Sequence, residues 1–332
     1  EYPIFAPIPK VSEIALINEP LLTGVTMMDV LAPMGKGQNM LIVGSDHQQL
    51  QGYTRSLLKT QLEAGTICVY ASTSTLENRQ SGVEYLSTAP CNDEVSHAAE
   101  AVVKAAEACA LAEKCALQGK DALVVVDTVD SHKNLWDCTT RVLLEEFGTE
   151  AVVQGDINGA ASSEMRAFFS TLVQRAGHFN SKKGGGSVSI LLIATLPETD
   201  SEDTEFTIDD FSDANEKIRE RIQLLSDKMI PLTASTLRKI QIPVPSVSEG
   251  KRRLALQHLE DLHSMTDGMI WLDEERHYDP PLDPQRSVTR IGIGADTKSR
   301  ADAPALRKME GLRLALSQAE SMQGAEETPA TM

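Results

Sequence analysis

The segment from Gly44 to Gln51 has the position, but not the residues, of a loop that binds phosphate. It follows a short apolar run, Met40 to Val43, that predicts a buried strand, and it precedes a helical pattern over residues 53–63. A strand that ends in glycine, followed by a loop and a helix, binds phosphates because backbone N–H groups at the start of the helix point at the anion. The first chemistry to consider is therefore nucleotide binding.

Three residues that this chemistry needs are replaced. The working pattern is GxxxxGK followed by Ser or Thr, and Gly44 keeps its first glycine. Gln49, Leu50 and Gln51 stand at the second glycine, the lysine and the hydroxyl, so the close approach to phosphate, the neutralising charge and the magnesium ligand are all lost. We expect no ATP hydrolysis, no metal site and no cofactor. Two alternatives stay open: a loop kept only for packing, and weak binding of ATP and magnesium without hydrolysis.

Strands and helices alternate along the chain, which predicts an α/β fold with a mainly parallel sheet flanked by helices. The strands are near-continuous apolar runs, as in a sheet that is buried on both faces. The predicted strands are Met40 to Val43, Ile67 to Ala71, Ala122 to Val126, Val188 to Ala194 and Met269 to Leu272, and the predicted helices are 53–63, 95–118, 163–176 and 302–322.

Motifs on both sides of the altered loop resemble the alpha subunit of rotary (F-type) ATP synthases. Residues 20–38 resemble that family's PLxTGxxxxDxLxPxGxGQ pattern, which runs directly into its phosphate loop, and Cys68-Val69-Tyr70 is similar to its CIYV strand. Further similarities follow in the family's order: residues 119–127 to its magnesium-site strand, 264–270 to SITDGQI, 287–292 to SVSRVG and 312–318 to its LxLELAQ helix. The resemblance implies a RecA-like P-loop NTPase domain in a divergent, degenerate paralogue.

The resemblance covers most of residues 18–322 and implies a domain organisation. Residues 1–20, which contain four prolines, are expected to form an extended arm, residues 21–322 the nucleotide-binding domain, and residues 323–332 a tail. Insertions are expected near 148–162 and at about 197–257, and the family's N-terminal β-barrel and most of its C-terminal helical domain are expected to have no counterpart here.

The resemblance also assigns roles to single residues. Thr75 falls where the family has a catalytic Glu or the alpha subunit's Gln, and a threonine neither acts as a base nor orients water well at neutral pH. Asp127 closes the magnesium-site strand, and we expect it to cap that strand or to bond the altered loop rather than to bind magnesium through water. Arg290 matches the arginine that reaches a neighbouring catalytic site; we expect it to pair within its own chain, near Asp267 or with a carboxylate by the loop, with the arginine-finger role as the alternative. His47 is expected to be solvated.

Charge and cysteine content narrow the function classes. A net charge of −17 argues against nucleic-acid binding, which needs a basic surface, and no apolar run approaches the ~20 residues that span a bilayer. We therefore expect protein subunits of a larger complex as partners, with no nucleic acid and no direct membrane insertion. Five cysteines without a CxxC pair suggest free thiols in a reducing compartment. Because the chain begins at Glu1, we expect a processed N-terminus and an organelle, mitochondrion or chloroplast.

Together these observations predict a catalytically inactive ATP synthase alpha-like subunit, a pseudo-ATPase with a structural or assembly role in a larger organellar complex. Two other functions remain open. One is a non-catalytic sensor that binds ATP. The other is a genuine ATP synthase subunit that lends Arg290 to a neighbouring catalytic site in proton-driven ATP synthesis.

Overall fold

The chain folds into two compact units in the computed structural model. The first comprises Glu1–Thr195 and Asp261–Met332, and the second comprises Leu196–Glu260. The structure describes residues 2–73, 76, 78–157, 160–196, 206–211, 215–228, 230–240, 242, 247–273, 279–290, 311, 314, 315 and 318.

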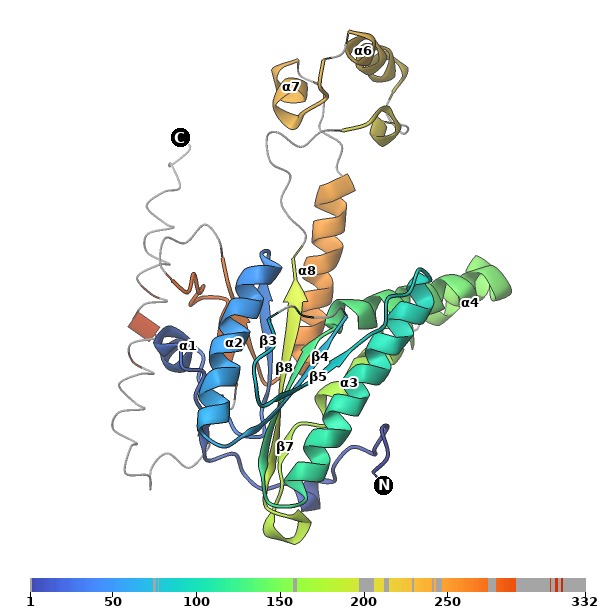
Figure 1. Ribbon diagram of the computed structural model, residues 1–332. Coiled ribbons are helices and arrows are strands. Elements are labelled where there is room, and N and C mark those ends of the chain that lie inside the picture. The colour runs from blue at the N-terminus through green and yellow to red at the C-terminus, as the bar shows by residue number, and fades with distance from the viewer. Residues whose placement is uncertain are drawn as a thin grey trace. The chain divides into compact units, whose positions relative to one another are not determined.

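A sheet of eight strands forms the centre of the first unit (Figure 1). Its order is β10-β9-β3-β8-β6-β4-β5, with β7 paired to β8, and only the β10–β9 and β7–β8 pairs are antiparallel. The strands are β3 (Asn39–Gly44), β4 (Ile67–Ser72), β5 (Val83–Ser87), β6 (Asp121–Asp127), β7 (Gly177–His178), β8 (Ser187–Thr195), β9 (Gly268–Trp271) and β10 (Val288–Thr289), beside a separate pair of β1 (Pro20–Leu21) and β2 (Met34–Gly35). The α/β fold with a mainly parallel sheet is confirmed.

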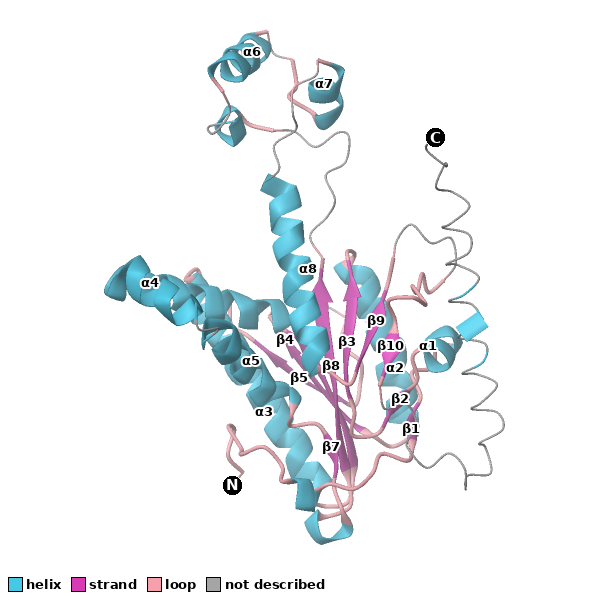
Figure 2. Ribbon diagram, turned by 180° about the vertical axis from the view of Figure 1, so that it is seen from behind, coloured by secondary structure: helices cyan, strands magenta, loops and turns pink. Residues whose placement is uncertain are grey.

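Helices cover both faces of this sheet, which is why its central strands are apolar on both sides (Figure 2). One face, which includes Ile42, Tyr70 and Val125, shares a core cluster with Leu57 and Leu58 of α2. On the other side α3 packs against β4, β6 and β8, and its many alanines allow a close approach. The helices of this unit are α1 (Thr26–Leu31), α2 (His47–Glu63), α3 (Glu94–Ala116), α4 (Val129–Ile157) and α5 (Ala160–Val173), with 3-10 turns η1 (Val11–Glu13) and η2 (Ser181–Lys183).

Several predicted elements have different bounds, and some elements were missed. All five predicted strands are present, but the helix expected at 53–63 begins six residues earlier, at His47, because Asp46 caps it. Strand β5 and helix α4 were not predicted; α4 breaks at Gly148, where φ is 78° and ψ is 162°. The helix expected at 302–322 lies outside the described residues except at four positions, and the tail at 323–332 lies wholly outside them.

The second unit has a small core of its own. It contains η3 (Ile208–Phe211), α6 (Glu216–Asp227) and α7 (Ala234–Lys239), and α8 (Val247–Met265) leads from it back to β9. Phe211, Ile222, Leu232, Leu237 and Ile242 are buried together. Its bounds, Leu196–Glu260, lie close to those of the insertion expected at about 197–257. In the part of the chain that the structure describes, no helix combines the length and apolarity required to cross a membrane.

Candidate nucleotide site

The altered loop lies at the carboxyl edge of the parallel sheet, where this class of fold binds its ligands. Strand β3 ends at Gly44, which pairs in register with Thr195 at the end of β8. Strand β6 ends at Asp127, on the far side of β8 from β3. The strand, loop and helix of a phosphate site are therefore all present, in the order that the sequence predicts.

The carboxylate of Asp46 takes the position of an anion at the start of α2. Its Oδ1 accepts hydrogen bonds from the backbone N–H groups of Gln48, at 2.8 Å, and Gln49, at 3.2 Å. These are the orphan donors that a helix N-terminus offers to a phosphate. Because the chain's own carboxylate already satisfies them, a phosphate there would lose those donors and meet a like charge. Because α2 begins at His47, the backbone that would surround the phosphates in a working loop is helical here.

Leu50 turns the lysine position into a part of the core. Its side chain has no exposed surface and belongs to the cluster that joins α2 to the sheet. A Cβ at Gly44 would lie 3.2 Å from Leu50 Cδ2, so the first glycine of the pattern makes room for this leucine. Gln49 beside it is half-buried. No cation reaches the carboxyl edge from this position.

Asp127 is enclosed by side chains from two elements, β4 and α2. Its Oδ2 accepts from the Tyr70 hydroxyl at 2.7 Å and from Gln51 Nε2 at 3.1 Å, and it lies 3.3 Å from His47 Nε2. Asp127 thus bonds the altered loop, one of the two contacts expected of it. Burial, followed by the Asp127 carboxylate, raises the pKa of Tyr70, so its hydroxyl stays a donor. A magnesium ion at Asp127 would have to displace these donors.

His47 is exposed, as expected of a solvated histidine, but it also takes part in this network. Its side chain is 45 % exposed, but its two ring nitrogens lie 3.3 Å from Asp127 Oδ2 and 3.3 Å from Thr195 Oγ1. The hydrogen bond with Asp127 raises the pKa of His47, against the opposing effect of its partial burial. Below that pKa the imidazolium supplies the local positive charge that Leu50 cannot.

Whereas Gly44 lies at the carboxyl end of β3, Arg290 lies near the amino-terminal ends of β3 and β9. Its backbone N–H donates to the Asp267 carbonyl at 2.8 Å, and Asp267 in turn bonds Asn39, the first residue of β3. Its guanidinium donates to the carbonyls of His263, at 3.1 Å, and Ser264, at 3.2 Å, in the last turn of α8. Arg290 therefore pairs within its chain near Asp267, as expected, but it bonds carbonyls at a helix end rather than a carboxylate. Thr75, the remaining predicted site residue, lies outside the described residues.

The Arg290→Ala variant should lose about 1 kcal/mol of unfolding free energy, because two carbonyls at the negative end of α8 lose a cationic donor. Urea unfolding followed by circular dichroism would measure this, with Arg290→Lys as the control that keeps the charge. We expect the ATPase activity of any complex that contains the protein to stay unchanged. A hundredfold fall in that activity at unchanged stability would instead assign Arg290 to a neighbouring catalytic site.

Two participants in the site were missed from the sequence, Asp46 and Tyr70. An aspartate directly before a helical pattern is a strong N-cap signal, so Asp46 was recognisable. Tyr70 was recognised only as part of a strand. Its contact with Asp127 depends on β4 and β6 being neighbours in register, a pairing that no local pattern specifies.

The sheet, its helices and the strand–loop–helix at the carboxyl edge define a RecA-like P-loop domain. No family model matches the chain. The chain is 27 % identical, over 97 % of its length, to "ATP synthase subunit alpha" of Caldanaerobacter subterraneus subsp. tengcongensis. It is 27 % identical, over 60 % of its length, to "ATP synthase subunit alpha 2" of Nitrosospira multiformis, and 30 % identical, over 58 %, to "ATP synthase subunit alpha" of Acholeplasma laidlawii.

These similarities confirm the resemblance that the motifs indicated, and the protein is ATP synthase alpha-like. The matched regions amount to 53 %, 39 % and 38 % of the three relatives, so the chain spans about half of their length or less.

Proposed function

We propose that this protein is a non-catalytic, ATP synthase alpha-like subunit with a structural or assembly role in a multi-subunit complex. The observation that carries the proposal is the Asp46 carboxylate bonded to two free amides in the first turn of α2, those of Gln48 and Gln49, at 2.8 and 3.2 Å. An empty phosphate site would leave those donors to solvent, whereas here an internal anion replaces the ligand. The buried Leu50 and the enclosed Asp127 support the same conclusion, because neither is available to a triphosphate or its magnesium.

The predicted partners are other subunits of the complex, and the proposed compartment is an organelle, mitochondrion or chloroplast. The reason for this choice is that rotary ATP synthases of mitochondria and plastids are members of the family that the motifs resemble. Native purification from organelle membranes, followed by mass spectrometry of the co-purifying proteins, would test both proposals. Recovery of the protein without any companion subunit would contradict the role in a complex.

Millimolar magnesium-ATP should leave the melting temperature of the protein unchanged. A ligand present at a hundred times its dissociation constant adds about 2.7 kcal/mol of stability, so even moderate binding is measurable by differential scanning fluorimetry. Phosphate release, assayed on the same samples, should not exceed that of heat-inactivated protein. A rise of several degrees would support the ATP-sensor alternative, and release that scales with protein concentration would refute the pseudo-ATPase proposal.

A further inference from the structure

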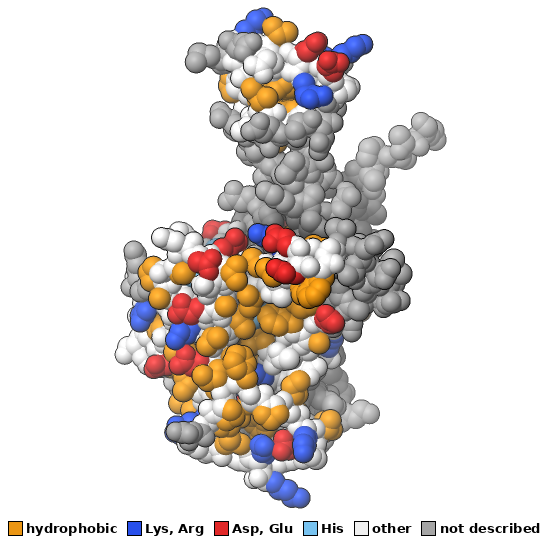
Figure 3. Space-filling view, turned by 90° about the vertical axis from the view of Figure 1, so that its right-hand side faces the viewer, with side chains coloured by type: hydrophobic (Ala, Val, Ile, Leu, Met, Phe, Trp, Pro, Cys, Tyr) orange, Lys and Arg blue, Asp and Glu red, His pale blue; other side chains and the backbone are white. Residues whose placement is uncertain are grey.

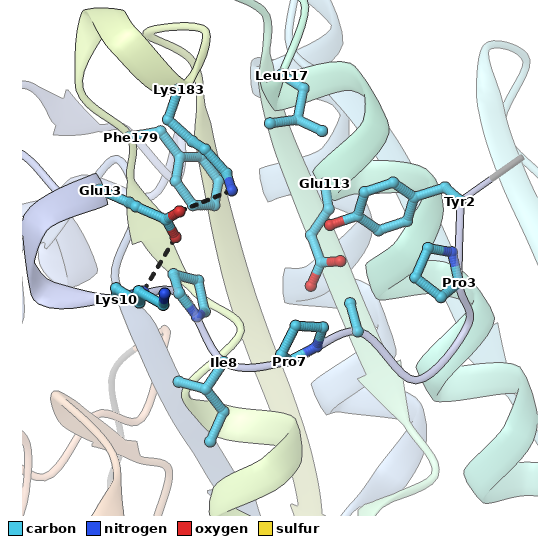
Figure 4. Close-up of a pocket in the computed structure, with 12 residues that line it drawn as sticks. Tyr2, Pro3, Pro7, Ile8, Lys10, Glu13, Glu113, Leu117, Phe179 and Lys183 are labelled. Carbon is cyan, nitrogen blue, oxygen red and sulfur yellow. Dashed lines mark hydrogen bonds and ion pairs between the residues drawn. The ribbon is translucent and has the colours of Figure 1, made fainter.

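The N-terminal arm crosses the first unit and encloses a pocket of about 280 Å³ (Figure 4). One wall is the arm itself, and the other is formed by the end of α3 and the turn around η2. In Figure 4 the ring of Phe179 and the side chains of Leu117 and Pro7 border the space between the arm and α3. The lining residues are Tyr2, Pro3, Ala6, Pro7, Ile8, Pro9, Lys10, Glu13, Glu113, Leu117, Phe179 and Lys183.

The arm is fastened at both ends of the pocket, so the pocket is formed before any ligand arrives. At one end Arg175 Nη1 donates to the carbonyl of Ile4 at 2.8 Å. At the other, Lys183 Nζ donates to Glu13 Oε1 at 3.0 Å, and Asn180 Nδ2 donates to the Ser12 carbonyl at 2.7 Å. The prolines between these anchors restrict the arm to an extended conformation. A preformed pocket loses less entropy when it binds.

The two carboxylates in the pocket wall are both neutralised. Glu113 forms a paired contact with Arg175, at 2.6 and 2.9 Å, and Glu13 pairs with Lys183. The interior therefore presents mainly prolines, a leucine, an isoleucine and a phenylalanine. Such a lining accepts an apolar side chain, and Lys10 is its one charged side chain without an ion pair among the described residues.

The segments that form the pocket carry exposed lysines, although the chain as a whole has a net charge of −17, and one of these lysines, Lys10, lines the pocket itself. Lys10, Lys114, Lys120 and Lys182 are exposed, and none forms an ion pair with a carboxylate of the described residues. Lys114 is one turn before Leu117 on α3, and Lys182 belongs to η2. The Gly186 N–H, after η2, donates to the Ala116 carbonyl at 3.2 Å, so the end of α3 and the segment after η2 lie side by side. Figure 3 shows Lys and Arg side chains, with an Asp or Glu among them, at the lower end of one face of the first unit, below a broad apolar surface.

We propose that this pocket binds an acidic segment of a partner protein that inserts one apolar side chain between the arm and α3. The apolar lining fits the apolar side chain of such a segment, and the exposed lysines attract its acidic residues. Charge guides the approach of the two proteins, and the buried anchor residue supplies most of the binding energy. The proposal goes beyond the structural role inferred above. It does not depend on the nucleotide site, which lies at the opposite end of β6 and β8.

A labelled acidic peptide of about eight residues, with a Leu-Phe pair at its centre, is the probe. Fluorescence anisotropy should detect binding to the full chain, and the Lys120→Glu/Lys182→Glu variant should weaken it at least tenfold. Leu117→Asp, which places a charge at an exposed lining position, should weaken it similarly. The control is Lys59→Glu/Lys228→Glu, which makes the same change in net charge at exposed lysines elsewhere and should leave binding within twofold.

Four results would overturn the proposal. The first is no binding of the peptide at millimolar protein. The second is an equal loss in the control variant, which would reduce the effect to net charge. The third is unchanged binding to Leu117→Asp, and the fourth is equal binding of a peptide with Ser-Gly at its centre; either would exclude the apolar anchor. Thermal melting of each variant, required to stay within a few degrees of the native protein, separates lost binding from lost folding.

Discussion

The Leu50→Lys variant should lose about 4 kcal/mol of unfolding free energy or more, even though lysine is the residue that a working phosphate loop has at this position. The leucine has no exposed surface and packs with Leu57 and Leu58 of α2. The substitution therefore removes a buried apolar side chain and inserts an ammonium group with no partner, and each change costs several kcal/mol. Urea unfolding followed by circular dichroism would measure the loss.

The control is Leu50→Met, which keeps the volume and polarity of the site and should cost less than about 1.5 kcal/mol. Magnesium-ATP should not rescue Leu50→Lys, because Asp46 still bonds the amides that the phosphates require. The opposite outcome is informative. A stable Leu50→Lys protein whose melting temperature rises with magnesium-ATP would mean that position 50 faces the ligand, and that the native protein lost nucleotide binding through this residue alone.

The strands of the sheet were predictable because each can be recognised from its own residues. Each of the five predicted strands is an uninterrupted apolar run, and burial on both faces requires such a run at every central strand. The loss of the phosphate-site residues was also visible, since Gln49, Leu50 and Gln51 can be read against a fixed spacing. Strand β5 was missed because its five residues, Val83 to Ser87, include Glu84 and form no continuous apolar run. None of them is fully buried, since β5 lies at the edge of the sheet with β4 as its one neighbour.

What replaced the ligand was not predictable from the spacing. Asp46 is two residues from Gly44, but its role depends on where its side chain lies. It caps α2, which therefore begins at His47, and its carboxylate takes the place of an anion at the helix start. Tyr70 contacts Asp127 because β4 and β6 are neighbours in the sheet. His47 also reaches Asp127, because the start of α2 after β3 extends past the end of β8. Likewise, Arg290 lies far from the loop because β10 runs antiparallel to β9 and returns the chain to the opposite edge. The positions of His47, Tyr70 and Arg290 therefore depend on how the strands pair, which no single segment of the sequence specifies.

The Glu113→Gln variant should lose about 3–5 kcal/mol, the second large effect that the structure predicts. Glu113 and Arg175 are each 4 % exposed and are joined at 2.6 Å between Oε1 and Nε. Charges taken out of water in this way are strongly coupled, and removal of one leaves the other buried without a counter-charge. Thermal and urea unfolding would measure the loss. Lys104→Gln, which breaks the partly exposed Lys104–Glu107 pair on the same helix, is the matched control and should cost less than about 1 kcal/mol.

The two partners of the buried pair should differ in their effect on the arm. Glu113→Gln leaves Arg175 free to donate to the Ile4 carbonyl, whereas Arg175→Met removes that anchor as well. Trypsin cleavage after Lys10 should therefore be faster in Arg175→Met than in Glu113→Gln at equal stability. The double variant Glu113→Leu/Arg175→Met should recover much of the unfolding free energy, because an apolar pair of similar volume carries no desolvation penalty, but it should stay sensitive to trypsin. Equal protection of the arm in all three variants would mean that the ion pair stabilises the core alone, and that the prolines and the Glu13–Lys183 pair suffice to hold the arm.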